Sequence, residues 1–169
     1  QKKKTGYSES FDKPKRTFDY ELAGTGRRFV ALFLDMVILF FLGIILNFVI
    51  ELVFPAPNYL NYASTREYNV AFNAWYRFTY LCGVALNAAY YIVTLSKMDG
   101  QTLGKRAMGI RVVRTDGQAL SMLDAFLRNV IGYFVSIITI FIGFIWAIFD
   151  KENQAVHDKI AGTIVVRDQ

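Results

Sequence analysis

Three long apolar runs, separated by polar and basic segments, dominate the pattern of this chain. They cover roughly residues 28–54, 75–96 and 122–149. About 20 consecutive apolar residues in a helix are enough to cross the hydrocarbon core of a bilayer. The pattern therefore predicts an all-α integral membrane protein in which the first two runs form long transmembrane helices.

The expected path of the third run follows from the segments that flank it. Two short β-branched stretches lie before and after it, at residues 110–114 and 162–167. Because unpaired backbone N–H and C=O groups are costly, we expect these stretches to pair, which requires both on one side of the membrane. We therefore predict a re-entrant or short helical hairpin beside a small cytoplasmic β pairing. One long span is the alternative, because about 28 residues are few for two full crossings.

The distribution of Lys and Arg predicts the orientation of the chain. Residues 1–25 form a basic arm before the membrane domain, residues 26–169, and the loop 97–121 is also basic. In the loop 55–74, Arg66 is the only basic residue. Since basic residues concentrate on the cytoplasmic side, we expect the arm and the loop 97–121 to be cytoplasmic and the loop 55–74 to lie outside. Ser121, followed by Asp124, predicts a capping box where the third run begins.

Composition narrows the class of protein. Apolar residues make up 54% of the chain, charged residues 20%, and the net charge is +5. The basic residues flank the apolar runs and no nucleic-acid-binding motif is present, so the expected partner is the lipid bilayer and not nucleic acid. The single cysteine, Cys82, offers no disulfide and no metal-ligand spacing. Without a catalytic triad or paired carboxylates, we expect no enzyme, no cofactor and no metal site.

Asp35, a carboxylate inside the first apolar run, is the leading candidate for a functional residue. A charge at such a position is costly, and it marks either a functional site or a paired structural site. Arg28, seven residues earlier, lies on the same helical face about two turns away. We expect Asp35 to point into the protein toward a basic or amide partner. Arg128 is the first choice, because a guanidinium can hold a carboxylate with two hydrogen bonds, and Arg28, Asn129 and Asn87 are the alternatives.

Three segments resemble the RDD family of prokaryotic membrane proteins: RRFVALFLD, GQTLGKRAMGIRVVRTDG and FIGFIWAIFDKENQAVHDKIAGTIVV. That family is named for one arginine and two aspartates. By motif position, Arg28 looks like the arginine, Asp35 the first aspartate and Asp158, rather than Asp150, the second. Asp158 is equally suited to capping a helix start before Lys159. The resemblance implies a multi-pass protein of the prokaryotic plasma (inner) membrane.

Two functions remain open from the sequence. The first is an accessory or scaffold subunit of a larger membrane complex, with membrane-protein partners or a homo-oligomer. It is favoured because the chain is short for alternating access and shows no inverted repeat. The alternative, which the resemblance implies for some family members, is a monovalent cation/proton antiporter or other small transporter using an intramembrane carboxylate. The candidate charges under either function are Arg28, Asp35, Arg128 and Asp158.

Overall fold

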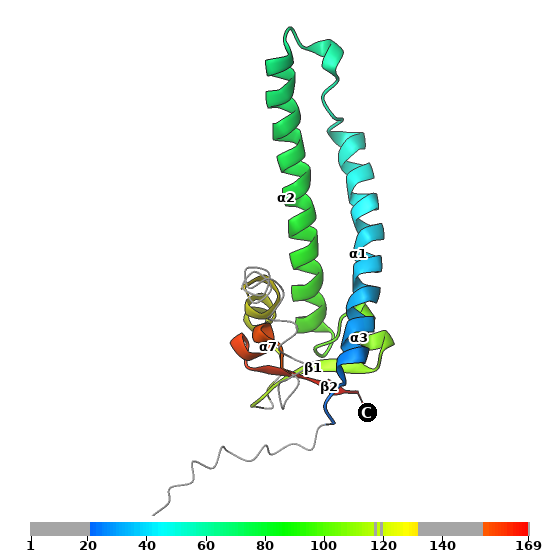
Figure 1. Ribbon diagram of the computed structural model, residues 1–169, viewed down its shortest axis with the longest axis vertical. Coiled ribbons are helices and arrows are strands. Elements are labelled where there is room, and N and C mark those ends of the chain that lie inside the picture. Colours follow the sequence, from blue (N-terminus) through cyan, green and yellow to red (C-terminus); the bar gives the residue numbers. More distant parts are fainter. Residues whose placement is uncertain (1–20, 117, 119, 132–153, 169) are drawn as a thin grey trace, which may run out of the picture.

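Two long helices rise side by side from a small mixed region that contains a two-stranded sheet (Figure 1). The computed structural model describes residues 21–116, 118, 120–131 and 154–168. Its elements are α1 (Thr25–Val53), the 3₁₀ turn η1 (Tyr59–Asn61), α2 (Thr65–Lys97), α3 (Leu103–Ala107), β1 (Ile110–Arg114), α4 (Met122–Phe126), the π-helical turn η2 (Leu127–Ile131), α7 (Val156–Ile160) and β2 (Thr163–Arg167). We call the region around β1 and β2 the sheet end, and the connection around η1 the loop end.

Both long helices are long and apolar enough to cross a membrane, as the first two apolar runs predict. The second helix begins at Thr65, however, ten residues before the predicted span. Its start is capped because the Ser64 side chain accepts a hydrogen bond from the Glu67 N–H at 3.3 Å. At the level of the predicted start, Trp75 Nε1 donates to the Phe54 carbonyl at 2.9 Å. The predicted loop 55–74 is therefore partly helical, and α2 extends beyond the end of α1.

The predicted strand pairing is confirmed. β1 and β2 are antiparallel, with Ile110 opposite Arg167 and Arg114 opposite Thr163. The segment that precedes α1 joins the other side of β2, because the Ala23 N–H donates to the Val165 carbonyl at 3.0 Å. The Arg167 N–H donates in turn to the Glu21 carbonyl at 2.8 Å. The sequence pattern did not predict this pairing of the segment before α1 with β2. It attaches the start of α1 to the sheet.

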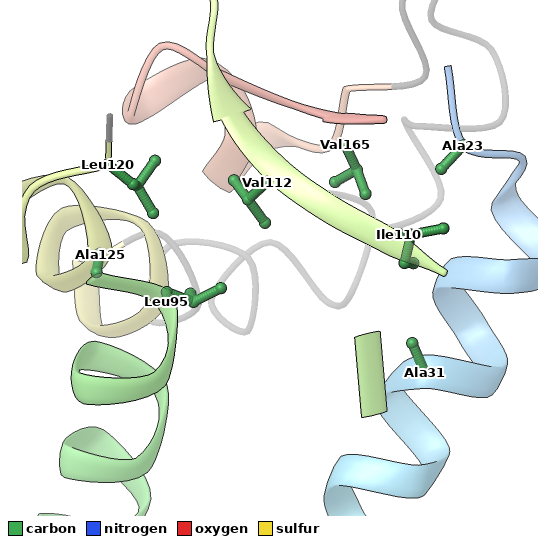
Figure 2. Close-up of a cluster of buried hydrophobic side chains, with 8 residues drawn as sticks. All are labelled: Ala23, Ala31, Leu95, Ile110, Val112, Leu120, Ala125 and Val165. Atoms are coloured by element: carbon green, nitrogen blue, oxygen red, sulfur yellow. The ribbon is translucent and has the colours of Figure 1, made fainter. Parts of the chain in front are cut away.

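A compact apolar core lies where the long helices meet the sheet (Figure 2). Ile110, Val112 and Val165 contribute from the strands, and Leu95 from the last turns of α2. Small side chains complete the cluster around them: Ala23, Ala31 and Ala125, together with Leu120. Higher up, α1 and α2 expose most of their apolar side chains. This division between a packed sheet end and exposed helices is expected if lipid or other membrane helices surround the upper part.

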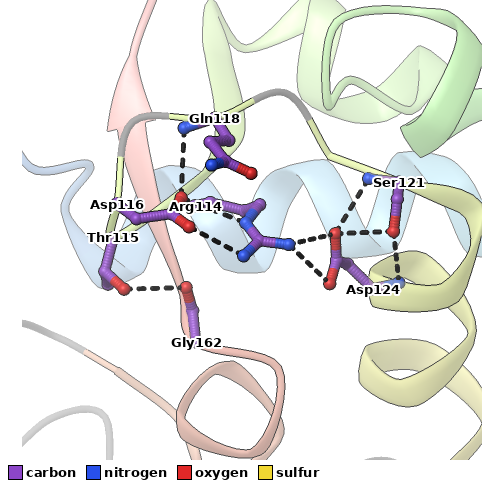
Figure 3. Close-up of polar contacts among 7 residues, drawn as sticks. All are labelled: Arg114, Thr115, Asp116, Gln118, Ser121, Asp124 and Gly162. Carbon is purple, nitrogen blue, oxygen red and sulfur yellow. Dashed lines mark hydrogen bonds and ion pairs between the residues drawn. The ribbon is translucent and has the colours of Figure 1, made fainter.

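Arg114, the last residue of β1, joins the sheet to the start of α4 (Figure 3). Its guanidinium contacts both carboxylate oxygens of Asp124 at 3.1 and 2.9 Å, and both oxygens of Asp116 at 3.0 and 2.7 Å. The predicted capping box is confirmed, because Ser121 Oγ accepts from the Asp124 N–H while Asp124 Oδ2 accepts from the Ser121 N–H. One carboxylate therefore both caps α4 and connects it to the sheet.

The third apolar run is described only at its start and beyond its end. Residues 132–153 lie outside the described part, and so does the choice between a hairpin and one long span. The flanking elements η2 and α7 contact each other at the sheet end. The start of the run and the element that follows it therefore lie at the same end of the long helices.

The loop end and the sheet end lie at opposite ends of the long helices (Figure 1), and they should face opposite sides of the membrane. In a Cys82→Ser background, Leu60→Cys and Ala107→Cys each place one thiol at an exposed position, one at each end. An impermeant maleimide should label one variant in intact cells and the other only after permeabilisation. Labelling of both variants in intact cells would contradict the arrangement.

Candidate functional site

Asp35 lies fully buried between α1, α2 and the first turn of α3. Its Oδ1 accepts hydrogen bonds from the Tyr90 hydroxyl at 2.7 Å and from the Gly104 N–H at 2.8 Å. Its Oδ2 accepts from the Thr102 hydroxyl at 2.6 Å. The prediction that Asp35 points into the protein is confirmed, and its carboxylate connects three separate elements.

The local sequence of α3 explains why its first turn fits against Asp35. Thr102 caps α3, since its Oγ1 accepts from the Lys105 N–H at 3.2 Å while its own hydrogen is directed to Asp35. Gly104 has no room for a side chain. An added Cβ would collide with the Ala31 carbonyl oxygen of α1 and approach Asp35 Oδ1 to 2.8 Å. The glycine therefore permits the backbone of α3 to reach the carboxylate directly.

Asp158 is the centre of a second charged cluster, at the start of α7. Arg128 Nη2 lies 2.6 Å from its Oδ1, and Arg28 Nη1 lies 3.5 Å from its Oδ2. Asp158 does cap a helix, but α7 begins at Val156 and not at Lys159 as predicted: Asp158 is its third residue, and the Ala155 N–H donates to Oδ2 at 3.1 Å. Arg28 further donates to the backbone carbonyls of Ala23 and Val165, each at 3.2 Å. This cluster connects the start of α1, η2, α7 and the sheet.

The predicted pairing of Asp35 with Arg128 is wrong. Arg128 and Arg28 both contact Asp158 instead. Asn129 Nδ2 donates to the Ala125 carbonyl, one turn earlier, at 2.9 Å. Asn87, the remaining alternative, is exposed on α2. The physical reason is that two hydroxyls and a backbone N–H donate to Asp35, so its carboxylate is satisfied without an Arg partner. The four candidate charges therefore divide into Asp35 on one side and Arg28, Arg128 and Asp158 on the other.

Tyr90, Thr102 and Gly104 are the site residues that the sequence interpretation missed. Tyr90 could have been found from depth, because it precedes Lys97 by seven residues just as Asp35 follows Arg28 by seven. Two side chains equally far from the basic end of neighbouring antiparallel helices lie at the same level. Thr102 and Gly104 gave no comparable signal, since they belong to a loop whose short helix no periodic pattern predicts.

Burial and charge act together on the groups around Asp158. Burial opposes its ionisation, but Arg128, His157 and Arg28 outweigh it, so the pKa of Asp158 lies below its usual value. Burial lowers the pKa of His157 to about 4, helped by Arg128, Lys105 and Arg28 and opposed by Asp158. The neighbouring imidazole is therefore neutral at pH 7.

The charges of the same cluster also affect the pKa of Lys105, on α3. Burial and the charge of Arg128 lower the pKa of Lys105 to about 8, against the opposing influence of Asp35 and Asp158. Its ammonium also lies over the Tyr91 ring, 5.8 Å from the centroid. Within the described ranges, no group of three or more His, Cys, Asp or Glu side chains is placed to hold a metal ion. The arrangement is chemically suited to holding elements together through charge and hydrogen bonds.

Comparison with known protein families finds a match that covers these residues. The sequence pattern of the RDD family matches residues 22–162, a range that includes both charged clusters. The chain belongs to the RDD family. All four candidate charges of this RDD protein fall inside the matched region, and so do the donors to Asp35.

Relatives of this RDD protein occur in Bacillus subtilis and Rickettsia prowazekii. It is similar to Uncharacterized protein YxaI of Bacillus subtilis (strain 168), with 35% identity over 148 residues that cover 85% of this chain and 96% of that protein. Uncharacterized membrane protein YteJ of the same organism is 32% identical over 80 residues, 47% of this chain and 48% of that protein. Uncharacterized protein RP437 of Rickettsia prowazekii (strain Madrid E) is 32% identical over 77 residues, 46% of this chain and 42% of that protein. No solved structure matches the chain.

Gly104→Ala should destabilise the protein, because the new methyl group would push α3 away from Ala31 and Asp35. Overpacking of this kind typically costs about 1–3 kcal/mol. Thermal unfolding of the detergent-solubilised protein, followed by circular dichroism, measures the effect. Gly43→Ala is the matched control, because nothing lies within 4 Å of its added Cβ. Equal melting temperatures for Gly104→Ala and the wild type would contradict the close approach.

Stability should fall between pH 6.5 and pH 4 because of His157. Its native pKa of about 4 lies below the ordinary value of 6.5, so the unfolded chain takes up the proton first as the pH falls. The stability lost over this window is on the order of 3 kcal/mol if His157 acts alone. His157→Gln removes the titrating group, so its melting temperature should depend less steeply on pH over the same window. Parallel pH profiles for the two proteins would refute this assignment.

Proposed function

We propose that this RDD protein is an accessory or scaffold subunit of a larger complex in the prokaryotic plasma membrane. The observation that carries the proposal is the state of Asp35. Each oxygen of its carboxylate already receives a short hydrogen bond from another element of the same chain. A carboxylate committed in this way stabilises the arrangement of α1, α2 and α3, and it needs no transported ion.

The surface of the long helices agrees with a subunit that works through contacts in the membrane. Large apolar side chains are directed outward along the whole of α1, including Phe29, Phe48 and Leu52 at 71%, 69% and 76% exposure. In a bilayer this surface meets lipid or the helices of other proteins. Among the described residues, packing is concentrated at the sheet end, and the proposal assigns the exposed surface of the upper helices to partners.

The proposal includes an orientation. Basic side chains gather at the sheet end, whereas Arg66 is the one basic residue of segment 55–74. By the positive-inside rule, the sheet end and the N-terminal arm are cytoplasmic and the third apolar run returns to the cytoplasmic side. In the labelling experiment above, Leu60→Cys is then the variant that reacts in intact cells.

Monovalent cation/proton exchange is the second candidate function, and one observation favours it. Asp35 is a fully buried carboxylate within a helix that is long and apolar enough to span the bilayer. Buried carboxylates at such positions form the proton relays of known pumps and transporters. The two candidates differ in what the loss of the Asp35 charge would do.

Asp35→Asn should lower the yield of correctly assembled protein and leave no specific ion phenotype. Removing the charge weakens three hydrogen bonds to an ionised group, each worth roughly 1.5–3 kcal/mol. Assembly is measured as the monodisperse fraction after mild detergent extraction, together with the membrane proteins that co-purify. Exchange is measured with a pH-sensitive dye in proteoliposomes under Na⁺ or K⁺ gradients.

Glu51→Gln is the matched control, because it removes an exposed carboxylate from the same helix. Under the scaffold proposal this control keeps wild-type yield and wild-type partners. A variant Asp35→Asn that assembles normally but loses exchange would instead establish transport. Normal assembly together with unchanged exchange would remove Asp35 from both functions.

A further inference from the structure

Two sets of basic side chains at the sheet end differ in how their charge is balanced. Those on the strands pair with carboxylates of the same chain, in the ion pairs Arg111–Asp168, Arg114–Asp116 and Arg167–Glu21. Three exposed ones on the helices have no carboxylate within ion-pair distance in the part of the chain that the structure describes: Arg27, Lys97 and Arg106. We call these three residues the basic collar. The positive-inside rule counts basic residues whether or not they are paired, so it does not explain this division.

The collar lies at the level where the exposed apolar surface of the long helices ends. Asp35 of α1 and Tyr90 of α2 are joined by a hydrogen bond, so they mark equal depth on the two helices. Arg27 precedes Asp35 by eight residues, and Lys97 follows Tyr90 by seven. Both therefore lie about 10–12 Å from that hydrogen bond toward the sheet end. If the apolar helices span the bilayer, this is the level of the lipid headgroups.

Each residue of the collar has an exposed apolar side chain beside it. Residues three or four apart share one face of a helix. The pairs are Arg27–Val30, Lys97–Val93 and Arg106–Leu103, and their apolar members are 42%, 51% and 43% exposed. A long basic side chain can extend its charge to the headgroups while its apolar neighbour meets the acyl chains. Each pair thus offers a cation and an apolar surface together, which are the two contacts that a phospholipid makes.

The short helix α3 brings Arg106 to the same boundary. The Gly104 N–H in its first turn donates to Asp35 at 2.8 Å, so α3 lies against the part of α1 that begins the apolar surface. Leu103 and Arg106 are both exposed on this helix. The third member of the collar therefore belongs to the same level as the first two.

We infer that the basic collar binds the headgroups of acidic phospholipids in the leaflet at the sheet end. A guanidinium can hold two phosphate oxygens with parallel hydrogen bonds. Basic residues directly beside the cytoplasmic ends of transmembrane helices attract lipids with a net negative charge more strongly than zwitterionic ones. A soluble anion, a nucleic acid or an acidic protein segment would neutralise the cations but leave the apolar member of each pair without a partner.

This lipid site stands apart from the proposed function, since a scaffold and a small transporter could both hold acidic lipids. Its test does not involve Asp35, so failure of either proposal can be recognised separately.

Native mass spectrometry of the detergent-solubilised protein measures the binding of single lipid molecules. The wild type should bind phosphatidylglycerol more tightly than phosphatidylcholine. The double variant Arg27→Gln/Arg106→Gln should lose about twentyfold in affinity for phosphatidylglycerol, because each basic residue near an anionic lipid contributes roughly fivefold. Its affinity for phosphatidylcholine should be unchanged.

Two further variants separate the collar from total charge and from folding. Arg111→Gln/Arg167→Gln is the matched control, because it removes two arginines of the same end that already pair with carboxylates, and it should keep wild-type affinity. Arg27→Lys/Arg106→Lys keeps the charge and should retain most of the preference, which a folding defect would not do. Equal affinity of the wild type for both lipids, or equal losses in the two glutamine variants, would overturn the inference and assign the collar to an acidic protein segment. Displacement of the lipid by free glycerol phosphate at similar concentration would overturn it in favour of a soluble phosphate.

Thermal unfolding in nanodiscs measures the same preference in a bilayer. The wild type should melt at a higher temperature in equal parts phosphatidylglycerol and phosphatidylcholine than in phosphatidylcholine alone, because a ligand that binds the folded state stabilises it. The difference should shrink in Arg27→Gln/Arg106→Gln and persist in Arg111→Gln/Arg167→Gln. High salt should reduce it in the wild type, since it screens exposed charges. An undiminished difference in the collar variant would refute the lipid site.

Discussion

The fold depends on the requirement that a carboxylate inside an apolar helix has its hydrogen bonds satisfied. Asp35 would destabilise α1 if it faced hydrocarbon. Its three donors come from α2 and from the first turn of α3, so satisfying it brings those elements against α1. The requirement also explains the composition nearby. A hydroxyl caps α3 and serves Asp35 at once, and a glycine is needed where the α3 backbone contacts α1.

A second buried carboxylate, Asp158, connects the start of α1 with η2 and α7. It caps α7 and forms ion pairs with Arg128 and with Arg28, which lies in the first turn of α1. Because buried carboxylates keep their charge only beside donors or cations, each of these two aspartates determines the position of several neighbours. The apolar core packs residues of both strands together with Leu95 from the last turns of α2.

Much of this architecture follows from sequence patterns whose physical basis is local. Runs of apolar residues predict α1 and most of α2, and the β-branched stretches predict the pairing of β1 with β2. The Ser121–Asp124 capping box and the burial of Asp35 were also predictable. The partner of Asp35 was not, because charge complementarity favoured Arg128, whereas two of its three neutral donors, Thr102 and Gly104, belong to a short helix that no periodic pattern predicts. The early start of α2 was missed because its first ten residues are too polar to resemble a membrane span.

The contact between Arg28 and β2 has a consequence for the order of biosynthesis. Arg28 and Asp158 are 130 residues apart in the chain, and Val165 follows later still. At a synthesis rate of about 5–20 residues per second, roughly ten seconds pass between the emergence of the two partners. During this interval α1 and α2 lack the ion pair and the strand contacts that later hold the start of α1. The two long helices are therefore made well before the sheet, which closes the structure only after β2 has left the ribosome.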